Sequence, residues 1–183
     1  ISSVELYYNY SSDNLTWNNW TNFGTGDYNA TNNVWEWKFS GIDGFYHFYT
    51  VTIDNAGNVE EAPTSADAIA GVDTITPTST IQTPPENSYF NSVPIWFNGT
   101  CSNGLSGINR VEINITYKEN STVVVPWTST NLAGNCTWWD YSFTPSIEAN
   151  YTVRIRAIDN ASNVQEIIST INITYDITPP FLL

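Results

Sequence analysis

The sequence predicts an all-β protein built from two tandem antiparallel β-sandwich units. Apolar and polar residues alternate with a period of two along several segments, and clusters of Asn, Gly, Asp and Pro separate those segments. One polar loop also occurs twice, as IDNAGNVEE from Ile53 and as IDNASNVQE from Ile158. No window of a dozen residues has convincing helical periodicity, and we allow only a short helical turn over 62–70.

The alternation places the expected strands. From Tyr151 to Ile158, the residues Tyr, Val, Ile and Ala alternate with Thr, Arg, Arg and Ile, so one face of this strand is expected to lie in a core. Similar runs predict strands at 35–39, 93–97, 111–117 and 169–175. In the repeated loops, the Asp is expected to accept hydrogen bonds from backbone amides just ahead of it. Gly57 supplies a positive φ angle there, which Ser162 adopts with slight strain unless its turn differs.

The repeated loop belongs to a longer repeat. Three pairs of segments align, with offsets of 105, 107 and 103 residues, and they begin at Tyr46 and Tyr151, at Val4 and Val111, and at Asp73 and Asp176. One unit is therefore a little over a hundred residues long, the size of a β-sandwich domain. We expect one unit at 1–75, a second at 76–178, and the start of a further strand or linker at 179–183.

The two units differ at their starts. About 33 residues from Thr78 precede Val111, whereas three residues precede Val4. The first unit is therefore expected to lack its first strands, which would leave sheet edges unpaired. Because the sequence opens on Ile1 and contains no Met, we expect a piece of a longer protein. The segment Phe181-Leu182-Leu183 has strand character, and it could pair with the open first unit of another copy.

The motif YxVxIxAxDNAxN followed by DxTPP resembles Ig-like or fibronectin type III-like repeats of bacterial and archaeal cell-surface proteins, and we expect an archaeal source. The resemblance covers both halves and implies two tandem Ig-like (fibronectin type III-like) antiparallel β-sandwiches. It places Tyr46 and Tyr151 at the corner tyrosine of this fold, near the start of strand F. Such sandwiches serve as spacers, adhesins and S-layer modules alike, so the resemblance implies a structural or adhesive role in an S-layer, stalk or filament.

Composition removes several classes of function. Lys and Arg number 5 against 18 Asp and Glu, giving a net charge of −13 that repels nucleic acid. No apolar run approaches the roughly 20 residues that span a bilayer, and no signal peptide opens the sequence. Expected partners are other copies of the chain, neighbouring surface subunits and N-linked glycans.

The two cysteines, Cys101 and Cys136, favour one disulfide over a metal site, because the sequence has neither a Cys-x-x-Cys motif nor a His cluster. Two buried free thiols are the alternative. Closing a loop of this length contributes roughly 3 to 4 kcal/mol in the chain-entropy model. A disulfide indicates an oxidising, extracellular setting, either at the cell surface or secreted.

N-x-S/T sequons are about twice as dense as chance placement gives. Eleven of the 23 Asn residues start one, whereas 40 Ser and Thr among 183 residues would give about five. Polar β-surfaces favour Asn and Thr in any case, but exposed loops and outward strand faces also admit glycans. Asn98, Asn114 and Asn172 are the favoured sites, as each lies on the polar side of an alternating strand. The sequons begin at Asn9, Asn14, Asn19, Asn29, Asn98, Asn114, Asn120, Asn135, Asn150, Asn160 and Asn172.

We do not expect an enzyme. The single histidine, His47, lies on a predicted strand face with no nucleophile pattern nearby, and no acidic pair stands out for acid–base work.

A secreted carbohydrate-binding module is the alternative function, because eight Trp and eleven Tyr offer rings on which sugars stack. Core and cross-strand packing is the simpler role for these rings. Trp138 and Trp139 must point to opposite faces, so at least one is exposed or lies under a glycan, whereas Trp35 and Trp37 share one strand face. The Trp residues that crowd the first unit are Trp17, Trp20, Trp35 and Trp37.

Calcium is the one cofactor that the sequence suggests. Acidic and amide side chains recur near the ends of both units, where bound Ca²⁺ stiffens linkers in cadherin-like arrays. The sequence has no D-x-D-x-D-G loop, so Asp residues that only cap their own turns are the simpler interpretation. The candidate ligands are Asp54, Asn55, Asn58 and Asp73 in the first unit, and Asp159, Asn160, Asn163 and Asp176 in the second.

Overall fold

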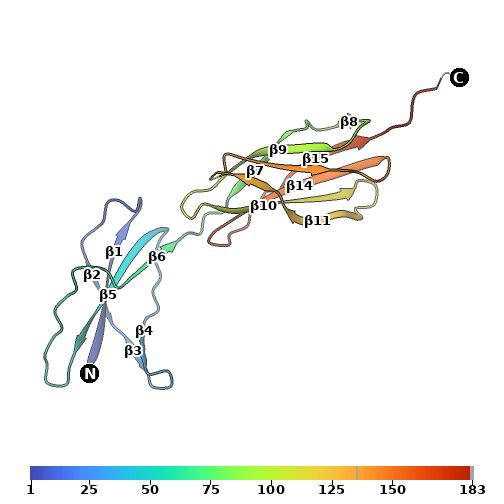
Figure 1. Ribbon diagram of the computed structural model, residues 1–183. Coiled ribbons are helices and arrows are strands. Elements are labelled where there is room, and N and C mark those ends of the chain that lie inside the picture. The colour runs from blue at the N-terminus through green and yellow to red at the C-terminus, as the bar shows by residue number, and fades with distance from the viewer. Residues whose placement is uncertain (135, 182–183) are drawn as a thin grey trace. The chain divides into compact units, whose positions relative to one another are not determined.

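A computed structural model describes residues 1–134 and 136–181, and every regular element among them is a β-strand. The prediction of an all-β protein is therefore confirmed. The chain divides into two compact units, Ile1–Thr74 and a second that begins at Ile75 (Figure 1). In the described part of the chain, no helix is long and apolar enough to cross a membrane.

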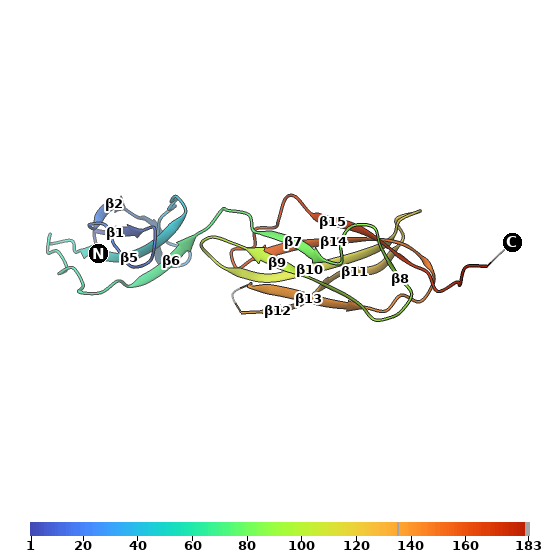
Figure 2. The ribbon, with the colours of Figure 1, turned by 90° about the horizontal axis from the view of Figure 1, so that it is seen from above.

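Unit 2 is an antiparallel sandwich of two sheets (Figure 2). The five-stranded sheet has the order β11-β10-β14-β15-β8, in which only the pairing of β15 with β8 is parallel. Its strands are β8 (Ser88–Phe90), β10 (Ile108–Tyr117), β11 (Val123–Ser129), β14 (Ala149–Asp159) and β15 (Ser169–Tyr175). The four-stranded sheet has the order β12-β13-β9-β7. Its strands are β7 (Thr78–Thr83), β9 (Ile95–Ser102), β12 (Asn131–Ala133) and β13 (Trp138–Phe143).

The core of unit 2 lies between these sheets. The predicted alternation along β14 is confirmed, since Tyr151, Val153, Ile155 and Ala157 are all fully buried. They pack with residues of the opposite sheet, among them Trp139. Burying large apolar side chains at roughly 1.5–3 kcal/mol each makes this interface the main source of the unit's stability.

Unit 1 has one four-stranded antiparallel sheet of order β2-β1-β5-β6, and a separate hairpin of β3 and β4. The sheet consists of β1 (Ser3–Ser11), β2 (Thr21–Thr25), β5 (Gly44–Ile53) and β6 (Ala68–Val72). The hairpin consists of β3 (Asp27–Asn29) and β4 (Val34–Glu36). Strand β1 pairs with β5 along its whole length, from Ser3 opposite Ile53 to Ser11 opposite Phe45.

Two local predictions for unit 1 are wrong. The segment allowed as a helical turn over 62–70 contains no helix and instead leads into β6, where Phe48 of β5 pairs with Ala68. The strand predicted at 35–39 ends at Glu36. Trp37 lies beyond it, and its indole N–H donates a hydrogen bond to the Gly24 carbonyl at 3.0 Å, so Trp35 and Trp37 do not share a strand face.

The repeated loops form as the sequence predicts. In unit 1 the Asp54 carboxylate accepts hydrogen bonds from the backbone N–H groups of Ala56 and Asn58, both at 2.8 Å. Gly57 has φ +86° and Ser162 has φ +73°, so both loops use the same left-handed turn. The serine takes this conformation without the freedom that glycine has.

Both predicted corner tyrosines are present. The Tyr46 hydroxyl donates a hydrogen bond to the Ile42 carbonyl at 2.8 Å, and the Tyr151 hydroxyl donates one to the Ile147 carbonyl at 2.7 Å. Each bond spans four residues and ties the start of β5 or β14 to the segment before it, as in a tyrosine corner. The two units therefore share this corner as well as their loops.

Candidate functional site

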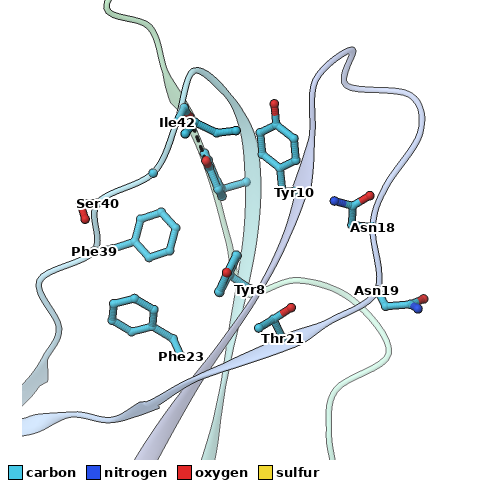
Figure 3. Close-up of a pocket in the computed structure, with 11 residues that line it drawn as sticks. Tyr8, Tyr10, Asn18, Asn19, Thr21, Phe23, Phe39, Ser40 and Ile42 are labelled. Carbon is cyan, nitrogen blue, oxygen red and sulfur yellow. Dashed lines mark hydrogen bonds between the residues drawn. The ribbon is translucent and has the colours of Figure 1, made fainter.

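Unit 1 contains an aromatic pocket of about 360 Å³. Its rings come from β1 (Tyr8, Tyr10), β2 (Phe23), β5 (Tyr46) and the segment before β5 (Phe39), and Asn18 and Asn19 add amide groups. Figure 3 shows Phe23, Phe39 and Tyr8 beside one another, with both Asn side chains on the far side of the pocket. Apolar rings with a few polar groups are the usual lining of a site for small molecules.

The rings of this pocket hold one another in place. Phe39 is central: its centroid lies 5.2 Å from those of Tyr8 and Phe23, and 5.0 Å from that of Tyr46. Tyr10 packs against Tyr46 at 5.3 Å, and its hydroxyl donates to the Asp43 carbonyl at 3.0 Å. Burial raises the pKa of Tyr46, which further favours the protonated hydroxyl that donates to the Ile42 carbonyl.

Sequence reasoning singled out the tryptophans and missed this pocket. The sequence contains one indication of this pocket, because alternation along two strands puts the side chains of Tyr8, Tyr10 and Tyr46 on the same sheet face. No pattern in the sequence indicates Phe39, because this residue lies in an irregular segment.

The tryptophans of the first unit lie elsewhere. Trp17 stacks on His47 with centroids 3.6 Å apart, and Trp20 meets Tyr49 edge-on at 4.5 Å. His47 pairs with Asn9 across the sheet, on the face opposite to Tyr8. The His47 ring therefore packs against the indole of Trp17.

Three of the chain's five basic residues lie on the outer face of the large sheet of unit 2. Arg110 and Arg156 both bind the Glu112 carboxylate at 2.8 Å, and the Arg156 guanidinium lies 4.2 Å from the Trp127 ring centroid. The third, Arg154, donates to the Thr116 hydroxyl at 3.1 Å. Burial raises the pKa of Glu112, but its hydrogen bonds to Arg110 and Arg156 outweigh burial and hold it below its usual value.

Cys101 and Cys136 form a disulfide with a Cα–Cα separation of 5.4 Å. The neighbouring tryptophans point to opposite faces as predicted, since Trp139 is fully buried whereas Trp138 is 47% exposed.

The sequons differ in burial. Asn9 and Asn114 are buried, and the Asn114 side-chain amide donates to the Val125 carbonyl at 2.8 Å, so the amide of this favoured site is covered although it lies on the polar face of β10. Asn29, Asn98 and Asn172 are half-buried. Asn135 lies outside the described residues. The exposed sequon residues are Asn14, Asn19, Asn120, Asn150 and Asn160.

The carboxylates among the calcium candidates do not gather into a shared site. Within 1–134 and 136–181, no three His, Cys, Asp or Glu side chains lie where they could share a metal ion. The carboxylate of Asp54 binds its own loop, and Asp159 does the same through the N–H and side-chain amide of Asn163 at 2.8 and 2.9 Å. Asp176 accepts a hydrogen bond from the Thr178 N–H at 2.9 Å. Asp73 is half-buried where unit 1 ends.

No family model matches the chain, and no curated protein matches it. Similar solved structures include CopC from Methylosinus trichosporium OB3b, with 13% identity over 57% of this chain and 100% of that one, and a TM-score of 0.43. They also include a tetra-tandem repeat from the extending region of a large adhesion protein, with 16% identity over 95% of this chain and 42% of that one, and a TM-score of 0.47. An engineered protein shares 18% identity over 63% of this chain and 23% of its own length, with a TM-score of 0.42. With TM-scores below 0.5, these similarities assign neither a ligand nor a partner to this chain.

Proposed function

We propose that the chain is a structural, adhesive module of a glycosylated extracellular surface protein, such as an S-layer, stalk or filament subunit. The observation that carries the proposal is the repetition of one β-unit, with the same Asp-capped loop and the same tyrosine corner in both copies. A series of such units extends a chain by stacking modules, a spacer role that needs no catalytic group. The proposal accordingly includes no enzymatic activity.

The disulfide and the exposed sequons support the extracellular part of this proposal. The disulfide needs an oxidising compartment to persist. Five sequon residues are exposed on the described surface, where an oligosaccharide has room. The net charge of −13 favours a soluble, non-aggregating surface rather than binding to anionic polymers.

Glycosylation should follow exposure. In protein isolated from its own cells, we expect oligosaccharides on Asn14, Asn19 and Asn120, and none on the buried Asn9 and Asn114. Peptide mapping by mass spectrometry measures the occupancy of each site. Unmodified peptides at every sequon would show that the glycoprotein proposal is wrong.

A secreted carbohydrate-binding module is the second candidate, and the aromatic pocket of unit 1 is the observation that favours it. If the pocket binds sugar, Phe23→Ala should abolish binding on a glycan array, because Phe23 is a ring of the lining and is 40% exposed. Tyr89→Ala, which removes a 79% exposed ring in unit 2, is the matched control and should bind as the native chain does. The structural proposal instead expects no glycan binding by any of the three proteins.

A further inference from the structure

Strand β6 of unit 1 occupies the place that β15 has in unit 2. The sheets correspond strand for strand, with β2-β1-β5-β6 matching β11-β10-β14-β15. In unit 2 the far edge of β15 is covered by β8, whose Ser88 lies opposite Ile173. Among the described residues, β6 pairs on one side only, with β5.

The open edge of β6 is short, but the strand itself carries no charge or proline, and no covering segment among the described residues, that would oppose strand pairing. Its sequence, AIAGV, has no charged residue and no proline, and Ile69 is 69% exposed. Natural edge strands are normally blunted by Lys, Pro, a bulge or a covering segment, because a bare row of N–H and C=O groups recruits another strand. The edge of β6 is therefore available for pairing with another strand.

The part of the sheet face that β6 contributes is also exposed. Tyr46 of β5 pairs with Ala70 of β6, just as Tyr151 of β14 pairs with Ile173 of β15. Ile173 is buried in the core that β9 helps to form, whereas Ala70 is exposed. Unit 1 thus leaves open the β6 side of the face that the sheet of β7 and β9 covers in unit 2, whereas Tyr46 beside it is buried under Phe39.

A single side chain marks where the missing strand belongs. In unit 2 the buried Gln165 accepts hydrogen bonds from the Ala157 N–H at 3.0 Å and the Ser79 hydroxyl at 2.6 Å, and donates one to the Ser79 carbonyl at 3.2 Å. Gln165 thereby fastens β7 to the end of β14. Its counterpart in the repeat is Glu60, which accepts the equivalent hydrogen bond from the Thr52 N–H at 2.9 Å but is exposed.

We propose that unit 1 is completed by a segment of the β7-β8-β9 type, from polypeptide outside residues 1–74, which pairs with β6, covers the face at Ala70 and contacts Glu60. This inference rests on the structural function proposed above and names the partner of its first unit. Strand addition of this kind combines main-chain hydrogen bonds along the edge with side chains buried on the face. The same segment would cover part of the sheet that lines the aromatic pocket, because Tyr8 and Tyr46 lie on that face.

The C-terminal segment of a second copy would lack one contact of this role. Two residues after Pro77 comes Ser79, which binds Gln165, whereas two residues after Pro179 comes Phe181. A phenylalanine has no hydroxyl to offer to Glu60. The strand exchange considered for Phe181-Leu182-Leu183 is therefore not part of the proposal, and Leu182 and Leu183 lie outside the described residues.

Residues 75–107 of this chain include β7, β8 and β9, so a copy of them can replace the missing segment in a direct test. Residues 75–107 are copied in front of Ile1, with Cys101→Ser in the copy, so that the junction reproduces the one before Ile108. Hydrogen exchange is then measured by mass spectrometry in peptides from β1, β5 and β6, with peptides from β10 and β14 as the internal reference. We expect exchange in unit 1 to slow by about tenfold or more, and exchange in unit 2 to stay unchanged.

Two variants make the test specific. Phe97→Asp in the copy removes an apolar side chain that is fully buried in unit 2, and should return unit 1 to its original exchange rate. Glu60→Gln restores the amide that donates to the strand carbonyl in unit 2, and should slow exchange further in the grafted chain but not in the original one. Unchanged exchange in unit 1 on grafting, or equal protection by the Phe97→Asp graft, would overturn the proposal. Neither result bears on glycan occupancy, so failure here leaves the proposed function intact.

Discussion

Gly99→Ala is expected to destabilise unit 2 by about 3 kcal/mol or more, because overpacking a closely packed core costs 1–3 kcal/mol and more where backbone must move. Gly99 lies in β9 between Ile81 of β7 and Trp139 of β13. A Cβ atom at this position would overlap the Thr80 carbonyl oxygen and lie 2.9 Å from the Trp139 ring. Since the obstructing oxygen belongs to a paired strand, relief requires β7 to move away from β9.

Gly104→Ala is the matched control, because its added Cβ would meet only the end of the Ile75 side chain, at 3.9 Å. Urea denaturation, with protection of β14 peptides as the readout for unit 2, should show a large shift for Gly99→Ala and almost none for Gly104→Ala. Similar midpoints for the two variants would contradict the close approach of β7 and β9. Because Gly99 lies in unit 2, β1 and β5 peptides of unit 1 should unfold as in the native chain.

The sequence predicted those elements best in which local pattern and burial agree. The strand expected at 169–175 coincides with β15. The alternation from Tyr151 correctly predicts which side chains of β14 lie in the core. The corner tyrosines were also accessible, because the internal repeat places Tyr46 and Tyr151 at the same point of two similar units. Each of these features depends on residues close together in the chain.

Features that depend on distant partners were not predictable in this way. Trp37 continues an alternating pattern, but its ring turns to Gly24, thirteen residues earlier, and the strand ends. Asn114 lies on the polar face of β10 as expected, yet the neighbouring strand β11 supplies the Val125 carbonyl that holds its amide in a buried position. Alternation predicts which side chains lie on which face of a strand, but it does not predict which other segments pack against that face.

The aromatic pocket shows the same limit. Its lining joins three strands to the irregular segment around Phe39, and no spacing in the sequence relates Phe39 to Phe23. The density of aromatic residues indicated that stacked rings would exist, but the tryptophans that stood out by number pack elsewhere, as Trp17 does on His47. Composition therefore indicated that aromatic rings would pack together, and it did not predict the pocket.

Removing the disulfide is expected to cost unit 2 roughly 4 kcal/mol by the chain-entropy model, since the bond closes a loop with a sequence separation of 35 residues. It ties Cys101 of β9 to Cys136, which is buried just before β13. Cys136 has φ +65°, a left-handed conformation that is unfavourable for a side chain with a Cβ atom.

The measurement compares the native chain with a Cys101→Ala/Cys136→Ala double variant by thermal denaturation, each with and without reductant. Reductant should lower the melting temperature of the native chain to near that of the double variant, and should leave the double variant unchanged because it has no bond to break. The loss should be confined to unit 2, since both cysteines belong to it, so hydrogen exchange in the β1 and β5 peptides should not change. A native chain that melts at the same temperature with and without reductant would show that the cross-link contributes nothing to stability, and would remove the main support for an oxidising compartment.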